Sequence, residues 1–226
     1  MQNIEYYKKD QFLPGNIRDL VVTDVKLNSL NYRAPEFSDI NWQESVVIFG
    51  CSNVFGVGLS DDETIPYQLE KLLKRPVINM GVPSSSIAYS VFNQTILAES
   101  NQSPYAVINL WTSINRITYF YKNTPCHIGS WTNNLPGDNI FSRSIKSIFD
   151  AWNISESNPL MQSIFLQKMA EIIWKNTKHF QGTFFPNTRD ALNVNLFHYL
   201  DHGADNMHPG TRSAKAVAEQ LAQWCR

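Results

Sequence analysis

Three side chains at distant positions could together perform nucleophilic catalysis. Ser52 follows an apolar run that ends at Gly50, whereas Asp205 and His208 lie near the C-terminus, three residues apart. A serine hydroxyl is a weak nucleophile at neutral pH, so it needs a base within hydrogen-bond distance and a third group that holds this base in the correct tautomer. The spacing lets the Asp205 carboxylate accept from one ring nitrogen of His208 while the other nitrogen faces Ser52. These residues predict a serine nucleophile with a histidine base.

Donors for a developing negative charge are predicted beside that serine. Attack on an ester creates a tetrahedral oxyanion, and donors must already point to the place where this charge forms. The candidates are the backbone N–H groups of Ser52 and Gly81 and the side-chain amide of Asn115. Gly81 would also suit a strand end at positive φ, which is compatible with donating its N–H. Asn115 has an alternative role as a helix cap or Asx-turn residue.

The elements before these residues have the pattern of a parallel sheet. Short apolar runs predict strands at 46–49, 77–80 and 105–111, each followed by one of the candidate residues. A helix is expected from 61–64 onward, with Leu69, Leu72 and Leu73 facing inward, and another at 89–99. Strands alternating with helices indicate right-handed crossovers, and sites in such sheets lie at the carboxyl ends of the strands.

The rest of the chain completes a single domain, 1–226, of three-layer α/β/α type with a short, mostly parallel sheet. Residues 1–44 lack periodicity and are expected to form an extended N-terminal arm, and 117–157 is interpreted as an insertion that could form a lid. A long helix is predicted from Asn158-Pro159, a fourth strand at 182–185 and a final helix at 211–224. The apolar residues expected to face inward from the long helix are Leu160, Ile164, Phe165, Met169, Ile172 and Ile173.

Composition excludes several classes of function. Nineteen basic and 20 acidic residues give a net charge of -1, so no strong field attracts nucleic acid or an anionic membrane surface, and neutral small-molecule or carbohydrate substrates are the simpler expectation. Three scattered cysteines are interpreted as free thiols. No signal peptide or membrane-spanning run is recognised, which predicts a cytoplasmic protein. No cofactor is expected, and the oligomeric state is not determined by the sequence.

The four motifs in this order resemble those of the SGNH (GDSL-like) hydrolase superfamily, in a divergent form similar to those of phage and microbial genomes. The resemblance covers Val46 to the C-terminus and rests on Gly50-Cys51-Ser52, Gly81, Ser113-Ile114-Asn115 and Asp205-Asn206-Met207-His208. It implies a flavodoxin-like fold with a Ser52, Asp205, His208 triad and an oxyanion hole. The implied activity is that of an esterase with an acyl-serine intermediate, acting for example on an O-acetyl group of a carbohydrate. The motifs do not separate esterases from thioesterases, lipases or acyltransferases.

Two positions depart from the family pattern. Cys51 stands where an aspartate usually precedes the serine, which should alter local hydrogen bonds without removing activity. Arg116 follows Asn115 where an acid is usual, and its guanidinium could recognise a carboxylate or phosphate on the substrate or be bound to Asp61 or Asp62.

The same residues also allow other interpretations. The fold could serve as a non-catalytic glycan-binding or structural module. Cys51 could be imagined as the nucleophile, but its position favours a small buried residue. The aromatic side chains of the insertion could line a sugar or acyl site or simply pack over the sheet; they are Trp131, Phe141, Phe149 and Trp152. A metal-dependent hydrolase would instead use the residues His198, Asp201, His202, Asp205 and His208.

Overall fold

A five-stranded parallel sheet forms the centre of the molecule in a computed structural model that describes residues 25–100, 103–121, 124–131, 140–155 and 157–226. The strand order is β2-β1-β3-β6-β7, and every neighbouring pair is parallel. The strands are β2 (Val77–Gly81), β1 (Val46–Gly50), β3 (Ala106–Trp111), β6 (Lys178–Thr183) and β7 (Asn195–Leu196). The fold class and the first three strands were predicted correctly.

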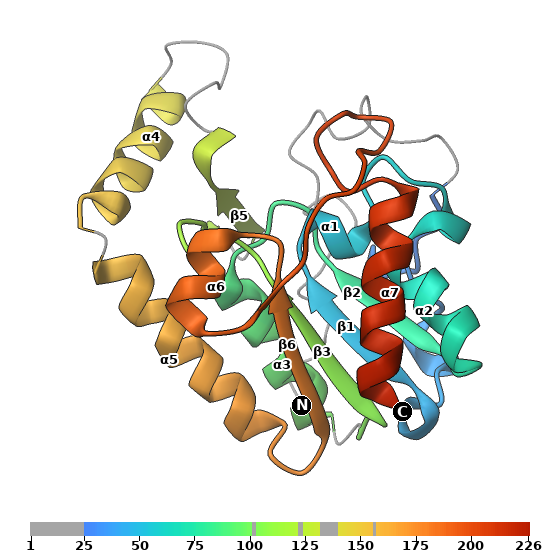
Figure 1. The fold of residues 1–226 in the computed structure, drawn as a ribbon. Coiled ribbons are helices and arrows are strands. Elements are labelled where there is room, and N and C mark those ends of the chain that lie inside the picture. Colours follow the sequence, from blue (N-terminus) through green and yellow to red (C-terminus); the bar gives the residue numbers. More distant parts are fainter. Residues whose placement is uncertain (1–24, 101–102, 122–123, 132–139, 156) are drawn as a thin grey trace.

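Helices cover both faces of this sheet, as Figure 1 shows. Val46 and Ile48 of β1 pack with helices α2 (Ile65–Leu73) and α7 (Thr211–Cys225). The alternate residues Val47 and Phe49 pack on the other side with α3 (Ile87–Glu99), and α3 contacts α5 (Ser157–Ile173). Because both faces are covered, β1, β2 and β3 are mostly apolar and show no alternation of apolar and polar residues, with Asn79 and Asn109 as the exceptions. This explains why continuous apolar runs located the strands.

The fourth strand, β6, lies earlier than the predicted 182–185. Its first half is polar and was missed because His179 and Gln181 are half-buried and hydrogen-bond to side chains of β3. His179 Nε2 accepts from the Asn109 side-chain amide at 2.8 Å, and Gln181 accepts from the Trp111 indole at 2.9 Å. Phe184 and Phe185 lie beyond the strand, and Pro186 begins helix α6 (Pro186–Leu192). A search for apolar runs therefore does not find this strand, because its polar side chains are hydrogen-bonded to partners on β3.

Three of the side chains expected to face inward from α2 and α5 are exposed instead. In α5, Phe165 and Ile172 are 63% and 68% exposed, so the expectation that they face inward is wrong. The buried positions of this helix include Gln167, which donates to the Leu192 carbonyl and to Gln181. Leu72 of α2 is also exposed, whereas Leu69 is fully buried. The buried side of α5 thus includes a hydrogen-bonded glutamine.

The described part of the N-terminal arm, 25–44, packs on the α3 side of the sheet. Tyr32 and Trp42 are buried there, and two short 3-10 turns follow, η3 (Phe37–Asp39) and η4 (Trp42–Glu44). The earlier part of the arm, 1–24, lies outside the described residues.

The predicted insertion, 117–157, contains regular structure. Strands β4 (Ile117–Tyr121) and β5 (Thr124–Ile128) form an antiparallel hairpin, and helix α4 (Ile140–Asn153) follows. Residues 122–123, 132–139 and 156 lie outside the described residues. Within the described ranges, no helix is both long enough and apolar enough to cross a membrane.

Candidate active site

A sharp turn from β1 into the short helix α1 (Ser52–Phe55) positions Ser52. Gly50 is required before it, because a Cβ atom there would overlap the Val54 side chain and lie 2.9 Å from the Leu110 carbonyl oxygen. Gly56 ends the helix in the left-handed region at φ 85° and donates its N–H to the Ser52 carbonyl. The close approach of α1 to the sheet therefore fixes Ser52 at the carboxyl end of β1.

Ser52, His208 and Asp205 form one hydrogen-bonded line. The Ser52 hydroxyl lies 2.8 Å from His208 Nε2, and His208 Nδ1 is hydrogen-bonded to the Asp205 carboxylate. The other carboxylate oxygen accepts the backbone N–H groups of Met207 and His208, each at 3.1 Å. The Asp205 side chain is fully buried and that of His208 is 22% exposed. The structure thus brings together three side chains predicted to meet, with the geometry of a nucleophile, a base and a group that orients the base.

The pKa of Asp205 lies below its ordinary value. Burial opposes ionisation of the carboxyl, but the hydrogen bonds from the His208 ring and from the Met207 and His208 N–H groups together outweigh it. Asp205 is therefore a carboxylate over the neutral pH range. A carboxylate at this place accepts a hydrogen bond from the His208 ring and so fixes the orientation of the ring.

The loop that carries Asp205 and His208 is fastened at both ends. Asp201 accepts the N–H groups of Arg212 and Ser213 at 2.9 and 2.8 Å, which satisfies donors at the start of α7. Ala204 donates its N–H to the Gly58 carbonyl at 3.1 Å. Gly58 has φ 80°, and a Cβ atom there would lie 3.1 Å from the Asp205 carboxylate. The loop after α1 and the loop before α7 therefore support each other.

Gly81 lies against the back of α1. A Cβ atom at this position would overlap the Phe55 backbone nitrogen, so only glycine fits. Its N–H donates to the Asn79 side-chain oxygen at 2.9 Å, and Asn79 in turn donates to the Val54 carbonyl at 3.0 Å. A substrate oxygen would have to compete with Asn79 for this N–H. The role of Gly81 as an oxyanion donor stays a prediction, and its packing role is clear.

Ser84 is a candidate donor that the sequence analysis missed. It lies in a turn closed by the Ser85 N–H to the Val82 carbonyl at 3.2 Å, and its φ is 64°. Pro83 before a residue with positive φ is typical of a type II turn, which was the available signal. Ser84 is half-buried, and its N–H has no acceptor among the described residues. The next residue, Ser85, contacts the Gly50 carbonyl at 3.5 Å, which places this turn beside the nucleophile turn.

Asn115 lies in the loop after β3, as predicted, and is half-buried. Its backbone N–H donates to the Ser113 hydroxyl at 3.4 Å. The residue lines a cavity of about 810 Å³ together with residues of α5 and α6, among them Ile164 and Ala191. Its role as an oxyanion donor stays a prediction, and a cavity at this loop offers room for part of a substrate.

Arg116 is not bound to either of the acids considered for it. Asp61 pairs with Arg33 at 2.6 Å, and Asp62 accepts from Ser60 at 2.7 Å. The Arg116 guanidinium instead lies over the rings of Trp131, 5.0 Å from its centroid, and Phe185, at 5.4 Å. It therefore belongs to the carboxyl-end surface of the sheet.

The remaining candidates have identifiable roles. Cys51 is buried, and the described cysteines are free thiols, as expected. Burial raises the pKa of the Cys51 thiol, but the Arg116 charge and local hydrogen bonds outweigh it and hold the pKa below its usual range.

In the described residues, no three His, Cys, Asp or Glu side chains are arranged to hold a metal ion. His202 stacks on Tyr199 at 5.7 Å. Phe141 has no described side chain.

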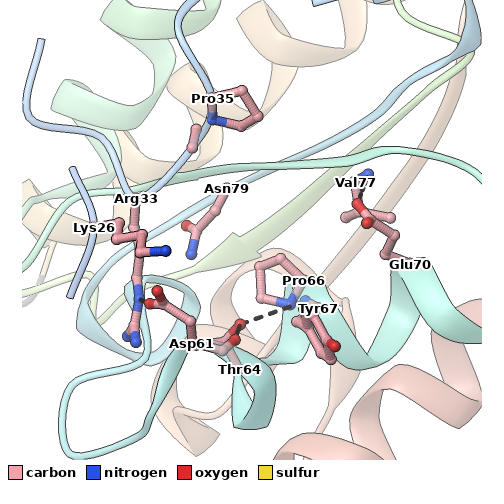
Figure 2. Close-up of a pocket in the computed structure, with 11 residues that line it drawn as sticks. Lys26, Arg33, Pro35, Asp61, Thr64, Pro66, Tyr67, Glu70, Val77 and Asn79 are labelled. Carbon is pink, nitrogen blue, oxygen red and sulfur yellow. Dashed lines mark hydrogen bonds and ion pairs between the residues drawn. The ribbon is translucent and has the colours of Figure 1, made fainter. Parts of the chain in front are cut away.

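A separate cavity of about 300 Å³ lies beside the arm, and none of its lining residues belongs to the Ser52 site. Figure 2 shows Arg33 and Asp61 side by side in it. The buried Arg33 guanidinium donates to the carbonyl oxygens of Phe55, Gly56 and Leu59 at 3.1, 2.8 and 2.9 Å. These carbonyls belong to the end of α1 and to the loop after it. Arg33 therefore connects the arm to the segment that follows Ser52.

Comparison with known proteins supports the architecture. The sequence matches no family model and no curated protein. Among solved structures, an acetyl xylan esterase, Est2A, from Butyrivibrio proteoclasticus has a TM-score of 0.50 at 12% identity, over 83% of this chain and 64% of that one. A protein named TesA has a TM-score of 0.49 at 13% identity, over 80% and 98% of the two chains. A putative lipolytic G-D-S-L family protein from Desulfitobacterium hafniense DCB-2 has a TM-score of 0.46 at 17% identity, over 80% and 99%. The chain has an SGNH-like hydrolase fold.

Proposed function

We propose that this protein is a serine ester hydrolase that acts through an acyl-serine intermediate. The observation that carries the proposal is the line from Ser52 through His208 to Asp205, with 2.8 Å between the Ser52 hydroxyl oxygen and His208 Nε2. His208 takes the Ser52 proton as the hydroxyl oxygen attacks the ester carbonyl carbon, and then gives it to the departing alcohol oxygen. Water activated by the same histidine releases the acid and restores Ser52.

The oxyanion would be held by donors at the carboxyl ends of neighbouring strands. The Ser52 N–H begins α1 and has no acceptor within that helix, which suits it to this role. The further candidates are the Ser84 N–H and the Asn115 side-chain amide. The Gly81 N–H is another, if its hydrogen bond to the Asn79 side-chain oxygen breaks when substrate binds. Loss of one such donor commonly costs about 3 kcal/mol of transition-state stabilisation.

The substrate in this proposal is a carboxylic ester, with an O-acetyl group on a carbohydrate as one example. That example follows the family resemblance, and Est2A is described as an acetyl xylan esterase. Acetylated xylan therefore belongs in the substrate panel, together with short-chain aryl esters and thioesters.

The test combines covalent labelling with turnover. A fluorophosphonate probe should label Ser52 in the wild-type protein, located by peptide mass spectrometry, and Ser52→Ala should abolish both labelling and ester hydrolysis. Ser38→Ala is the matched control, because Ser38 is exposed on the arm and contacts only Asp39. A folded wild-type protein that resists the probe and hydrolyses no ester in the panel would refute the proposal and favour a non-catalytic module.

A further inference from the structure

Arg116 is held as a stacked cation on the surface where Ser52 lies. It follows β3, the strand between β1 and β6, and Gly50 at the end of β1 pairs with Leu110 near the end of β3. Phe185 follows β6 and lies under the guanidinium at 5.4 Å, and Trp131 faces it at 5.0 Å. A guanidinium that packs against aromatic rings keeps its N–H groups available for a planar acceptor.

The Arg116 guanidinium has no anionic partner among the described residues. Its Nη1 atom is buried, and no described residue accepts a hydrogen bond from it. Nor does Arg116 form an ion pair with any described acid, since Asp61 is already occupied by Arg33. A buried charged donor without an acceptor is costly, so such groups are normally paired in the functional state. An incoming ligand group is the partner that this geometry lacks.

The β4–β5 hairpin fixes one of the two aromatic rings. Ile117 pairs with Ile128, which brings Arg116 opposite Gly129. A Cβ atom on Gly129 would overlap the Trp131 ring, so the indole folds back over the glycine. The ring that contacts Arg116 is thus held by the backbone of the same hairpin, and the cation is preorganised.

His127 supplies a second unpaired donor in the same hairpin. Its Nδ1 lies 2.8 Å from Thr118 Oγ1, which lies 2.8 Å from Ser86 Oγ, and Ser86 accepts the Tyr89 N–H at 3.2 Å. Both hydroxyl hydrogens are used if Ser86 donates to Thr118 and Thr118 donates to His127 Nδ1. The proton of the neutral ring then lies on Nε2, which is buried and has no acceptor among the described residues.

Strand pairing brings His127 close to Arg116 in sequence register, because His127 lies opposite Thr118, two residues after Arg116. Burial, and then the Arg116 charge, lower the pKa of His127 to about 4, so the ring is neutral at pH 7. The Arg116 charge also acts against burial on the pKa of Cys51, the residue before Ser52. The β4–β5 hairpin and the end of β3 therefore hold one positive charge and one neutral N–H, each without a hydrogen-bond acceptor among the described residues.

We propose that Arg116 and His127 form a subsite for a carboxylate on the ester substrate. A carboxylate carries one charge and two coplanar oxygens, which match one guanidinium and one neutral imidazole N–H better than a phosphate dianion does. This inference rests on the proposed function, because the carboxylate belongs to the molecule that Ser52 attacks. It replaces the expectation of neutral substrates, which came from the net charge alone.

The test compares two acetyl esters of nearly equal shape, 4-acetoxybenzoate and 4-acetoxybenzamide. Their dissociation constants are measured by calorimetry on Ser52→Ala, which binds without turnover, and their kcat/KM values on the protein with Ser52 intact. Tighter binding of the benzoate is expected, by about 10- to 100-fold, as for a charge-assisted hydrogen bond. Arg116→Gln should remove most of this preference, through KM more than kcat, and His127→Phe should remove part of it.

Arg75→Gln is the matched control, because Arg75 also stacks on an aromatic ring, Tyr105 at 3.8 Å, but at the opposite end of β3. Its benzoate preference should equal that of the wild type. Equal dissociation constants for the two esters on Ser52→Ala would overturn the subsite, whatever the fate of the Arg116 variant. Absence of turnover and of Ser52 labelling would instead overturn the proposed function, so the two failures are distinguishable.

Discussion

Replacing Gly81 with alanine tests how α1 positions the nucleophile. A Cβ atom here would overlap the Phe55 nitrogen and would lie 2.9 Å from the Val54 carbonyl carbon. Nonbonded carbon atoms in ordinary contact are about 3.5 to 4.0 Å apart. Alanine therefore requires α1 to move from β2 by about 1 Å, since the obstructing atoms are backbone and cannot rotate away. Ser52 begins α1 and moves with it.

The consequence for catalysis follows from the Ser52 geometry. The hydroxyl lies 2.8 Å from His208 Nε2, and a shift of about 1 Å takes the pair beyond hydrogen-bond distance. Misplacing a reacting group by about 1 Å costs about 100-fold in rate. Gly81→Ala should thus lower kcat/KM about 100-fold while retaining the Gly81 N–H, and overpacking should lower the free energy of unfolding by about 1 to 3 kcal/mol.

The assays are steady-state hydrolysis of an aryl acetate, the rate of fluorophosphonate labelling of Ser52 and urea unfolding. Gly182→Ala is the control, because Gly182 lies on β6 and its Cβ would meet the Cε2 atom of the Phe197 side chain, which follows β7, at 2.5 Å. It should lose stability but keep its labelling rate. A folded Gly81→Ala protein with wild-type kcat/KM would refute the argument that this contact positions Ser52.

Two further predictions concern stability. Arg33→Met should lower the free energy of unfolding by about 3 kcal/mol, because the Phe55, Gly56 and Leu59 carbonyls lose their donor. Asp61→Asn should lower the free energy of unfolding by less in the same urea titration, because the Asp61 side chain is 41% exposed. Equal decreases for the two variants would contradict the role of the carbonyls. Burial lowers the pKa of His179 to about 4, below the unfolded value of 6.5, so the unfolded chain binds the extra proton between these values and stability falls as pH falls through this window. Between pH 7 and 4.5, the wild type should lose about 2 kcal/mol more than His179→Gln, and parallel pH profiles would show that this histidine does not contribute.

Much of the fold could be predicted from the sequence because the central strands are buried on both sides. Such strands are continuous apolar runs, and β1, β2 and β3 were located to within a residue or so at each end. An apolar run does not mark β6, because its half-buried side chains are polar. His179 and Gln181 are satisfied by partners on β3, and a sequence read locally gives no sign of these partners.

The buried face of a helix could likewise be predicted only in part, because it also depends on hydrogen-bond partners that are distant in the sequence. Phe165 and Ile172 were expected to be buried because they are apolar, but α5 turns Gln167 inward, where it hydrogen-bonds Gln181 and the Leu192 carbonyl. Ser84 was missed because it is a candidate donor through its backbone, which has a positive φ and an N–H without an acceptor among the described residues. The Pro83-Ser84 pair indicates a turn but does not show which strand end the turn faces.

By itself the sequence determined the local units: the apolar runs, the glycine that ends β1, and a carboxylate three residues before a histidine. Those depend on interactions between near neighbours, so residue type and spacing suffice. Only the tertiary structure decided that His208 lies 2.8 Å from a serine 156 positions earlier and that Arg116 stacks between Trp131 and Phe185. Such contacts depend on the strand order, because neighbouring parallel strands bring distant residues to one edge of the sheet, and this order is set by the packing of the whole core.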